Sequence, residues 1–131
     1  MARYLDSSAL VKLVVPETES DALRTFLGSG ESSIASSALA RTEVVRAVRR
    51  GGPAAILGAR SLLDDIAEIV LSRSLLDAAA VLLHDELVRA LDAIHLASAA
   101  LLGADLDVLV TYDHRMAHAA ESLGMPVASP A

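Results

Sequence analysis

The chain of 131 residues has the length of a single domain, and with 53% hydrophobic residues but few aromatics it can bury one core of aliphatic side chains. It has no cysteine, which excludes disulfides, thiol catalysis and zinc-ribbon sites. The net charge of -6 argues against a protein that holds nucleic acid through a general basic surface, so any such contact must be local.

We therefore expect one domain over residues 1–131. No apolar run is long enough to span a bilayer, and the start of the sequence has neither the basic nor the apolar region of a signal peptide. These features predict a cytoplasmic protein with no membrane contact.

The first residues predict a strand that ends on an acidic residue. Tyr4-Leu5 is followed by Asp6-Ser7-Ser8 and then by ALVKLVV, which indicates a strand that ends on Asp6 and opens into a helix. Pro16 ends that helix. A second helix is expected over residues 17–27, and a second short strand over 33–35.

The middle of the chain predicts further helices around one more strand. Ser36 or Ser37 caps a helix that runs to about Arg50 and carries Glu43, and Gly51-Gly52 closes it. Further elements are expected as a helix over 54–66, a strand over 67–71 and a helix over 74–84.

The stretch from Arg89 to Ala120 holds two acidic residues at the ends of two elements. Asp92 stands at the start of an almost entirely apolar helix over residues 93–102, which we expect to be buried on all sides and stopped by Gly103. Residues 107–111 read as a parallel strand covered on both faces, and Asp113 follows it. A helix over 117–123 and a short strand over 125–127 complete the chain.

Four or five short strands that alternate with helices predict a parallel sheet in an α/β sandwich. In open α/β sheets, ligands bind outside the carboxyl ends of the strands, and Asp113 lies just past such an end. Its position therefore favours a chemical role.

Asp6, Asp92 and Asp113 each directly precede an expected helix, so each could simply cap it. Serine, threonine or asparagine would cap equally well, whereas a hard divalent cation prefers carboxylate oxygens. Glu43 could instead form an ordinary ion pair with Arg46 or Arg50. If several carboxylates converge, either their pKa values rise or a cation neutralises them.

Four motifs in this order carry a family resemblance: YLDSSALVKL, ARTEVVRA, RALDAIHLASA and VTYDHRMAHAA. Together they resemble the PIN-domain ribonucleases, and most closely the VapC-type toxins of toxin–antitoxin pairs, over essentially the whole chain. The sequence departs from the family pattern with Tyr112 and His114 around the last acidic residue, and with Leu106-Asp107 between GAD and VLV.

The resemblance implies a three-layer α/β/α sandwich whose acidic residues gather at the carboxyl edge of a parallel sheet and bind Mg²⁺ or Mn²⁺. The family's acidic positions fall on Asp6, Glu43, Asp92 and Asp113, and its small polar positions fall on Ser7 and Thr111. We expect Asp6, Asp92 and Asp113 to be direct or water-mediated ligands. Glu43 would help to hold a metal or orient the attacking water, with one ion or two.

A metal at such a site can orient a water, favour its deprotonation and stabilise the charge that builds on a phosphodiester. The implied activity is therefore that of a metal-dependent endoribonuclease that hydrolyses RNA and acts as a growth-inhibiting toxin. The resemblance also implies a VapB-like antitoxin, which often places an arginine among the carboxylates, and a toxin homodimer.

The one basic concentration in this acidic chain flanks Glu43, and it comprises Arg41, Arg46, Arg49, Arg50 and Arg60. We expect Arg46 and Arg49 in particular to guide an RNA backbone, with Arg89 and Arg115 near the acidic ends doing likewise.

Three alternatives remain open. His114 and His118 have the spacing of a zinc pair but lack the glutamate of H-E-x-x-H and an evident third ligand, and His95 favours a hydrogen-bonded core residue with a secondary role beside Asp92. A receiver-like signalling domain would need a lysine near the site, and the only lysine is Lys12. A catalytically inactive Mg²⁺-binding module is the third.

Overall fold

The computed structural model describes residues 1–30, 32–84 and 87–131. In these residues five strands form one parallel sheet in the order β3-β2-β1-β4-β5. The strands are β1 (Ala2–Leu5), β2 (Ser33–Ser37), β3 (Ala67–Ile69), β4 (Leu106–Val110) and β5 (Val127–Ala128). The helices are α1 (Ser7–Val14), α2 (Ser20–Gly28), α3 (Ala40–Val48), α4 (Pro53–Asp65), α5 (Arg73–Val81), α6 (Ala90–Ala100) and α7 (His114–Ser122), with short 3₁₀ turns at Arg49–Gly51 and Gly103–Asp105.

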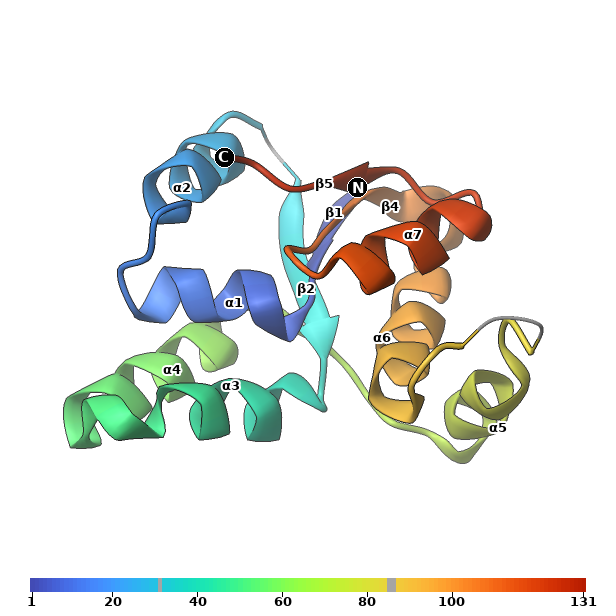
Figure 1. Ribbon diagram of the computed structural model, residues 1–131, viewed down its shortest axis with the longest axis horizontal. Coiled ribbons are helices and arrows are strands. Elements are labelled where there is room, and N and C mark those ends of the chain that lie inside the picture. Colours follow the sequence, from blue (N-terminus) through green and yellow to red (C-terminus); the bar gives the residue numbers. More distant parts are fainter. Residues whose placement is uncertain (31, 85–86) are drawn as a thin grey trace.

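Helices cover both faces of this sheet, because successive side chains of a strand point to opposite sides. Tyr4 packs with Leu109 against α6 and α7. Its neighbour Leu5 packs with Val110 in the second core, which α1, α3 and α4 complete. Figure 1 shows these two groups of helices on either side of the sheet. The three-layer α/β/α sandwich with a short parallel sheet is thereby confirmed.

The strand order positions the functional end of the sheet. β1 is central, with β2 and β3 added on one side and β4 and β5 on the other. Leu5 pairs with Val110, so the carboxyl ends of β1 and β4 lie side by side. The chain adds strands first on one side of β1 and then on the other, and open parallel sheets bind ligands where the strand order reverses in this way. Asp6 and Asp113 leave the sheet at this point.

Several local features differ from the sequence-based expectations: α7 begins at His114 rather than at residue 117, and β3 ends at Ile69 rather than at residue 71. Ser36 and Ser37 belong to β2 rather than capping α3, which begins after Leu39. Ser36 instead donates a hydrogen bond to the carbonyl of Leu5 at 2.6 Å, which ties β2 to β1. The unusual Leu106-Asp107 pair lies inside β4, where the register against β1 shifts by one residue. Asp107 is the extra residue of β4 that has no partner in β1, and it forms a β-bulge.

Helix α6 is buried along most of its length but not on all sides, because Ala100 is exposed and Leu101, just past its end, is 65% exposed. The expectation that it is buried all round is therefore wrong at its C-terminal end. Residues from Ala93 to Ala99 are buried or partly buried, and Gly103 has the positive φ of 52° expected of a glycine that ends a helix. This buried helix brings Asp92 and His95 to the end of the sheet. In the described part of the chain, no helix has both the length and the apolar character needed to cross a bilayer.

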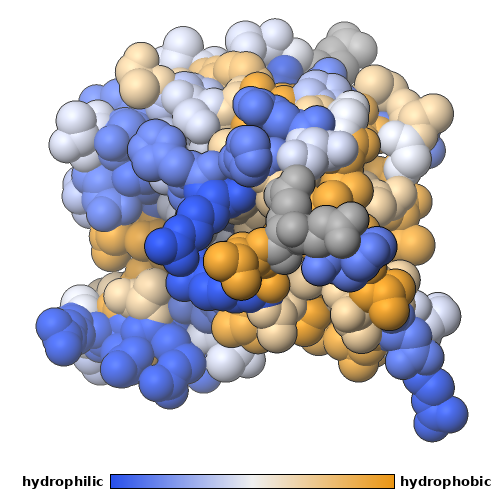
Figure 2. Space-filling view, turned by 45° about the vertical axis from the view of Figure 1, so that its right-hand side comes forward, coloured by the Kyte–Doolittle hydropathy of each residue, from blue (hydrophilic) through white to orange (hydrophobic). Residues whose placement is uncertain are grey.

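Exposed hydrophobic side chains are not spread evenly over the surface. Figure 2 shows them gathered on the side that carries α5 and α6. Leu76, Val81, Leu87 and Leu91 of this region are all exposed, Leu87 fully so. A gathering of exposed apolar side chains of this kind marks a contact region more often than an ordinary solvent face.

Candidate active site

Asp6 is held firmly in place immediately after β1. Its side chain is only 3% exposed and caps α1 by accepting the Ala9 N–H at 3.1 Å. Ser8 donates to the same oxygen at 2.6 Å, and the Thr111 hydroxyl donates to the other. Burial raises the pKa of Asp6 above its usual range, and the hydrogen bonds from Ser8 and Thr111 offset this only in part. A nearby positive charge would therefore favour the ionised form.

Glu43 reaches the same region from α3. Its Oε1 accepts hydrogen bonds from the Ser7 hydroxyl and from His95 Nε2, each at 2.6 Å. Burial alone would raise the pKa of Glu43, but the bonds from His95 and Ser7 outweigh it and hold the pKa below its usual range. In the described residues Glu43 has no ion pair with Arg46 or Arg50, so that interpretation of its role is wrong.

Asp92 and Asp113 share one arginine. Arg89 Nε lies 3.1 Å from Asp92 Oδ2, and its terminal nitrogen lies 3.3 Å from Asp113 Oδ2. Asp113 caps α7, as expected, by accepting the N–H groups of Arg115 and Met116. Asp92 does not cap α6, because Arg89 holds the cap position and Asp92 lies in the first helical turn. The expectation that Asp92 precedes the helix is corrected accordingly.

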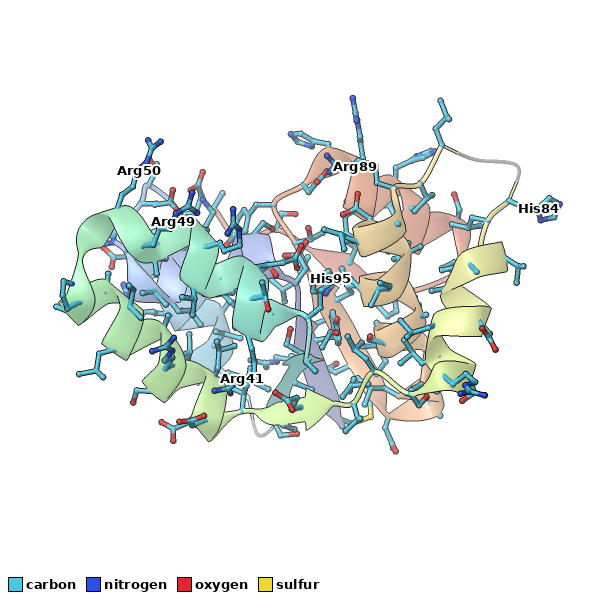
Figure 3. The ribbon with its side chains drawn as sticks, turned by 90° about the horizontal axis from the view of Figure 1, so that it is seen from below. Arg41, Arg49, Arg50, His84, Arg89 and His95 are labelled. Carbon is cyan, nitrogen blue, oxygen red and sulfur yellow. The ribbon has the colours of Figure 1, made fainter. Side chains whose placement is uncertain are left out.

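These side chains line one pocket, which we call the acidic pocket. Its volume is about 170 Å³, and its lining consists of Asp6, Ser7, Ser8, Glu43, Arg89, Asp92, His95, Asp113 and Met116. Thr111 is fully buried beneath it. In Figure 3, His95 lies in the interior and Arg89 at the surface. Carboxylates from four separate segments of the chain therefore meet at the carboxyl edge of the sheet.

The donor set suits a hard divalent cation, which prefers carboxylate oxygens. As the side chains stand, no three acidic or histidine residues within 1–30, 32–84 and 87–131 are arranged to hold a metal ion. The ion pairs of Arg89 contribute to this, because its guanidinium holds Asp92 and Asp113 and supplies positive charge between them. The chemistry of the residues fits the ion, although their present side-chain positions serve other partners.

Sequence reasoning missed part of this site. Ser8 donates to Asp6 and also accepts the Tyr112 N–H at 2.9 Å, so it joins the ends of β1 and β4. In the sequence, only the position of Ser8 two residues after Asp6 could have indicated this role. His95 is a hydrogen-bonded core residue, as expected, but its carboxylate partner is Glu43 rather than Asp92.

The arginines near Glu43 do not form a single patch. Arg41 pairs with Asp64 at 3.1 Å. In Figure 3, Arg41 lies on one side of the molecule, and Arg50 and Arg89 lie on the opposite side. Arg46 and Arg49, near the end of α3, are exposed, as is Arg115 on α7.

Comparison with known proteins identifies relatives over the whole chain. The family model of the PIN domain matches residues 3–122. The chain is 51% identical over 129 residues to Ribonuclease VapC46 of Mycobacterium tuberculosis, covering 98% of each protein. It is 41% identical over 132 residues to Ribonuclease VapC47 of the same species, covering 97% of this chain and 96% of that protein.

Solved structures share the fold at low sequence identity. A toxin–antitoxin complex from Klebsiella pneumoniae matches with a TM-score of 0.74 and 21% identity, covering 100% of this chain and 98% of that one. The M. tuberculosis toxin VapC20, described as cleaving the sarcin–ricin loop, matches with a TM-score of 0.72 and 16% identity, covering 90% and 95%.

Proposed function

The chain belongs to the PIN-domain family, and we propose that it is a VapC-type toxin that hydrolyses RNA phosphodiester bonds at the acidic pocket. One observation carries the proposal: Asp6, Glu43, Asp92 and Asp113 line the same pocket although they lie far apart in the sequence. The relatives named as ribonucleases, which match over almost their full length, support the same reaction. The site of action would be the cytoplasm, where RNA is present.

We propose Mg²⁺ or Mn²⁺ as the cofactor, held by Asp6, Asp92 and Asp113 directly or through water, with Glu43 beside them. A bound divalent ion would lower the pKa of water and neutralise charge on the phosphodiester. Arg89 now supplies the positive charge between Asp92 and Asp113, which the ion would supply in the loaded protein. The raised pKa of Asp6 supports this, because a bound cation would offset the burial that disfavours its ionised carboxylate.

The remaining residues orient these groups. Ser8 and Thr111 hold the two oxygens of Asp6. Ser7 holds Glu43, whose low pKa keeps it ionised and able to accept a hydrogen bond from an attacking water. These residues exert their effect by fixing carboxylate geometry before the substrate arrives.

RNA cleavage by the purified protein tests the proposal. A labelled RNA should be cleaved with Mg²⁺ or Mn²⁺, and cleavage should stop with a chelator and in Asp6→Asn and Asp92→Asn. Each variant replaces a carboxylate by an amide of nearly the same shape, so folding should be preserved, and circular dichroism checks this. Cleavage that persists with the chelator and in both folded variants would refute the proposal.

We propose a VapB-like antitoxin as the partner. A second hollow of about 260 Å³ adjoins the acidic pocket and is lined by Glu43, Arg89, Ala90, Leu91 and Asp92. It combines an exposed leucine with carboxylates, and this suits a segment that carries apolar side chains and an arginine. Co-expression with a cognate VapB-like antitoxin should give a stable complex without nuclease activity. An active complex would contradict this location.

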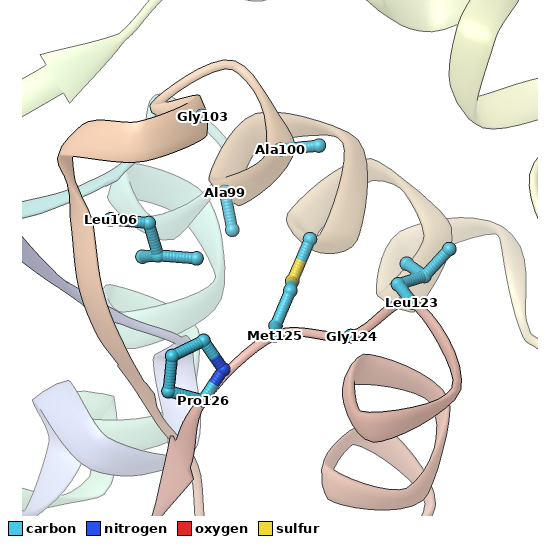
Figure 4. A pocket seen from close by; sticks show the side chains of 8 residues that line it. All are labelled: Ala99, Ala100, Gly103, Leu106, Leu123, Gly124, Met125 and Pro126. Atoms are coloured by element: carbon cyan, nitrogen blue, oxygen red, sulfur yellow. The ribbon is translucent and has the colours of Figure 1, made fainter.

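A homodimer is also proposed. A hollow of about 250 Å³ lies between the end of α6 and the segment that joins α7 to β5. The side chains that line it, shown in Figure 4, are Ala99, Ala100, Gly103, Leu106, Leu123, Gly124, Met125 and Pro126. Leu101 beside it is 65% exposed. Light scattering should give the mass of a dimer, and a monomer at micromolar concentration would contradict it.

The position of Lys12 disfavours a receiver-like domain, which would need a lysine beside the acidic cluster. Lys12 pairs with Glu19 at 2.6 Å and stacks over Tyr112, and it is not among the residues that line the acidic pocket.

A further inference from the structure

A hydrogen-bonded chain of side chains leads from the sheet to Glu43. The Tyr4 hydroxyl lies 2.7 Å from His95 Nδ1, and His95 Nε2 lies 2.6 Å from Glu43 Oε1. Tyr4 is fully buried and His95 is 3% exposed. The three residues belong to β1, α6 and α3, so the chain joins three elements at the acidic pocket.

The partners of His95 determine which ring nitrogen donates. Nε2 lies 2.6 Å from Glu43 Oε1, and a carboxylate oxygen accepts hydrogen bonds, so Nε2 is placed to donate. Burial raises the pKa of Tyr4, so the phenol keeps its proton and can donate to Nδ1. If the ring is neutral, Tyr4 therefore selects the tautomer with the proton on Nε2. If the ring is charged, Nε2 still donates to Glu43.

We propose that Tyr4 and His95 are positioning residues, which hold the Glu43 carboxylate in the orientation that the nuclease reaction requires. The proposal rests on the nuclease function given above. It assigns a role to two buried residues outside the expected acidic set.

The geometry at Glu43 explains why such a hold matters. The bonds from His95 and Ser7 both end on Oε1. In the part of the chain that the structure describes, no hydrogen bond occupies Oε2, which is left for a water or an ion in the pocket. A glutamate has three rotatable side-chain bonds, so without these contacts its carboxylate would sample several positions. Loss of an outer hydrogen bond of this kind commonly reduces metal affinity or activity by about 10- to 100-fold.

Two substitutions of His95 separate positioning from simple packing. In His95→Gln, the amide nitrogen can reach the position of Nε2 and donate to Glu43. In His95→Asn, the shorter side chain matches Nδ1 but cannot reach the carboxylate. We expect His95→Asn to lower kcat by about 10- to 100-fold with little change in KM, and His95→Gln to recover most of the loss.

The same pair of variants defines the contrary result. If both variants lose activity equally, in proportion to a fall in melting temperature, His95 serves packing alone and the proposal is overturned. Equal activity of both variants and the wild type would overturn it as well. In a Glu43→Ala background, His95→Asn should cost no further activity, because the residue it positions is absent.

A measurement on the metal-free protein keeps this inference separate from the nuclease assignment. Nitrogen NMR of the histidine rings should find a proton on Nε2 of His95, shifted by its bond to Glu43. The shift should change in Glu43→Ala, and Tyr4→Phe should alter the Nδ1 signal. A proton on Nδ1 alone would overturn the positioning role even if RNA is cleaved. So would His95 ring signals whose chemical shifts stay unchanged in both Glu43→Ala and Tyr4→Phe. If the wild type cleaves no RNA, the nuclease proposal fails, and the ring signals still decide whether His95 holds Glu43.

Discussion

Among the described residues, Asp6 is the acidic side chain whose charge burial disfavours most, because it is 3% exposed and its pKa is raised. Its pKa is raised, so the folded protein keeps this proton to higher pH than the unfolded chain does. In the absence of metal, the free energy of unfolding should therefore fall as the pH rises from the usual aspartate range, near pH ~4, through the folded pKa.

Asp6→Asn removes this charge and retains the cap on α1. We expect the metal-free variant to melt at a higher temperature than the wild type at neutral pH, and the difference to vanish below about pH 4. Thermal melts with chelator across this range measure it. A variant that melts lower than the wild type at neutral pH would mean that Asp6 is not destabilised by its charge.

Arg89 competes with any cation for the same two carboxylates. It is 64% exposed and lies within 3.3 Å of both Asp92 and Asp113, so its pairing is weakened by solvent. Arg89→Ala should tighten Mn²⁺ binding by a small factor, roughly twofold to fivefold, in calorimetric titration. Arg115→Ala, which removes an exposed arginine of α7, serves as the control. Equal affinities in both variants would mean that Arg89 does not compete.

The sequence predicted which carboxylates meet but not how each is held. Asp6 and Asp113 follow apolar strands, and this placed them at one edge of the sheet. The bond between His95 and Glu43 joins residues 52 positions apart and depends on the relative placement of α3 and α6. No local pattern carries that information, so the partner of His95 could not be predicted.

Helix α7 begins at a residue with two separable roles. Asp113 caps the helix, and its charge faces the acidic pocket. Asparagine caps a helix as well as aspartate, so Asp113→Asn should leave stability nearly unchanged, whereas Asp113→Ala should cost about 1 kcal/mol. Both variants should lose RNA cleavage. Denaturant unfolding and a cleavage assay measure this, and cleavage retained in Asp113→Asn would show that only the cap matters.

The elements themselves were largely predictable, and the errors have local causes. The apolar runs of β1 and β4 and the caps at Asp6 and Asp113 led to the observed strands and helices. The errors lie where two patterns compete. Ser36 and Ser37 resemble helix caps but continue β2, since their pairing with Glu68 and Ile69 of β3 outweighs the local preference.

The whole molecule is acidic, so RNA must approach it through a limited basic region. Arg46 is exposed on the helix that carries Glu43, and Arg49 is exposed just after that helix ends. Charge reversal of both should slow cleavage and flatten its dependence on salt, by about 0.7 in the logarithmic slope for each lost phosphate contact. The exposed pair Arg24→Glu and Arg73→Glu, outside the pocket lining, is the charge-matched control. Equal effects of the two pairs would indicate a general charge effect.

The strand order was not predictable from this chain alone. The alternation of strands and helices indicates a parallel sheet, and a resemblance to PIN-domain proteins indicates its layers. The placement of β1 between β2 and β4 depends on pairings between distant segments. That placement brings the acidic residues to one pocket and leaves apolar surface near α5 and α6 for partners.

Binding of Mn²⁺ to the purified protein tests most directly whether the acidic pocket is a divalent-ion site. Titration followed by electron paramagnetic resonance should give saturable binding to the wild type, about 10-fold or more weaker binding in Asp6→Asn and Asp92→Asn, and unchanged binding in His118→Ala, an exposed residue of α7 outside the pocket. Saturable binding that is equally strong in all four proteins, or no binding to the wild type, would contradict the account.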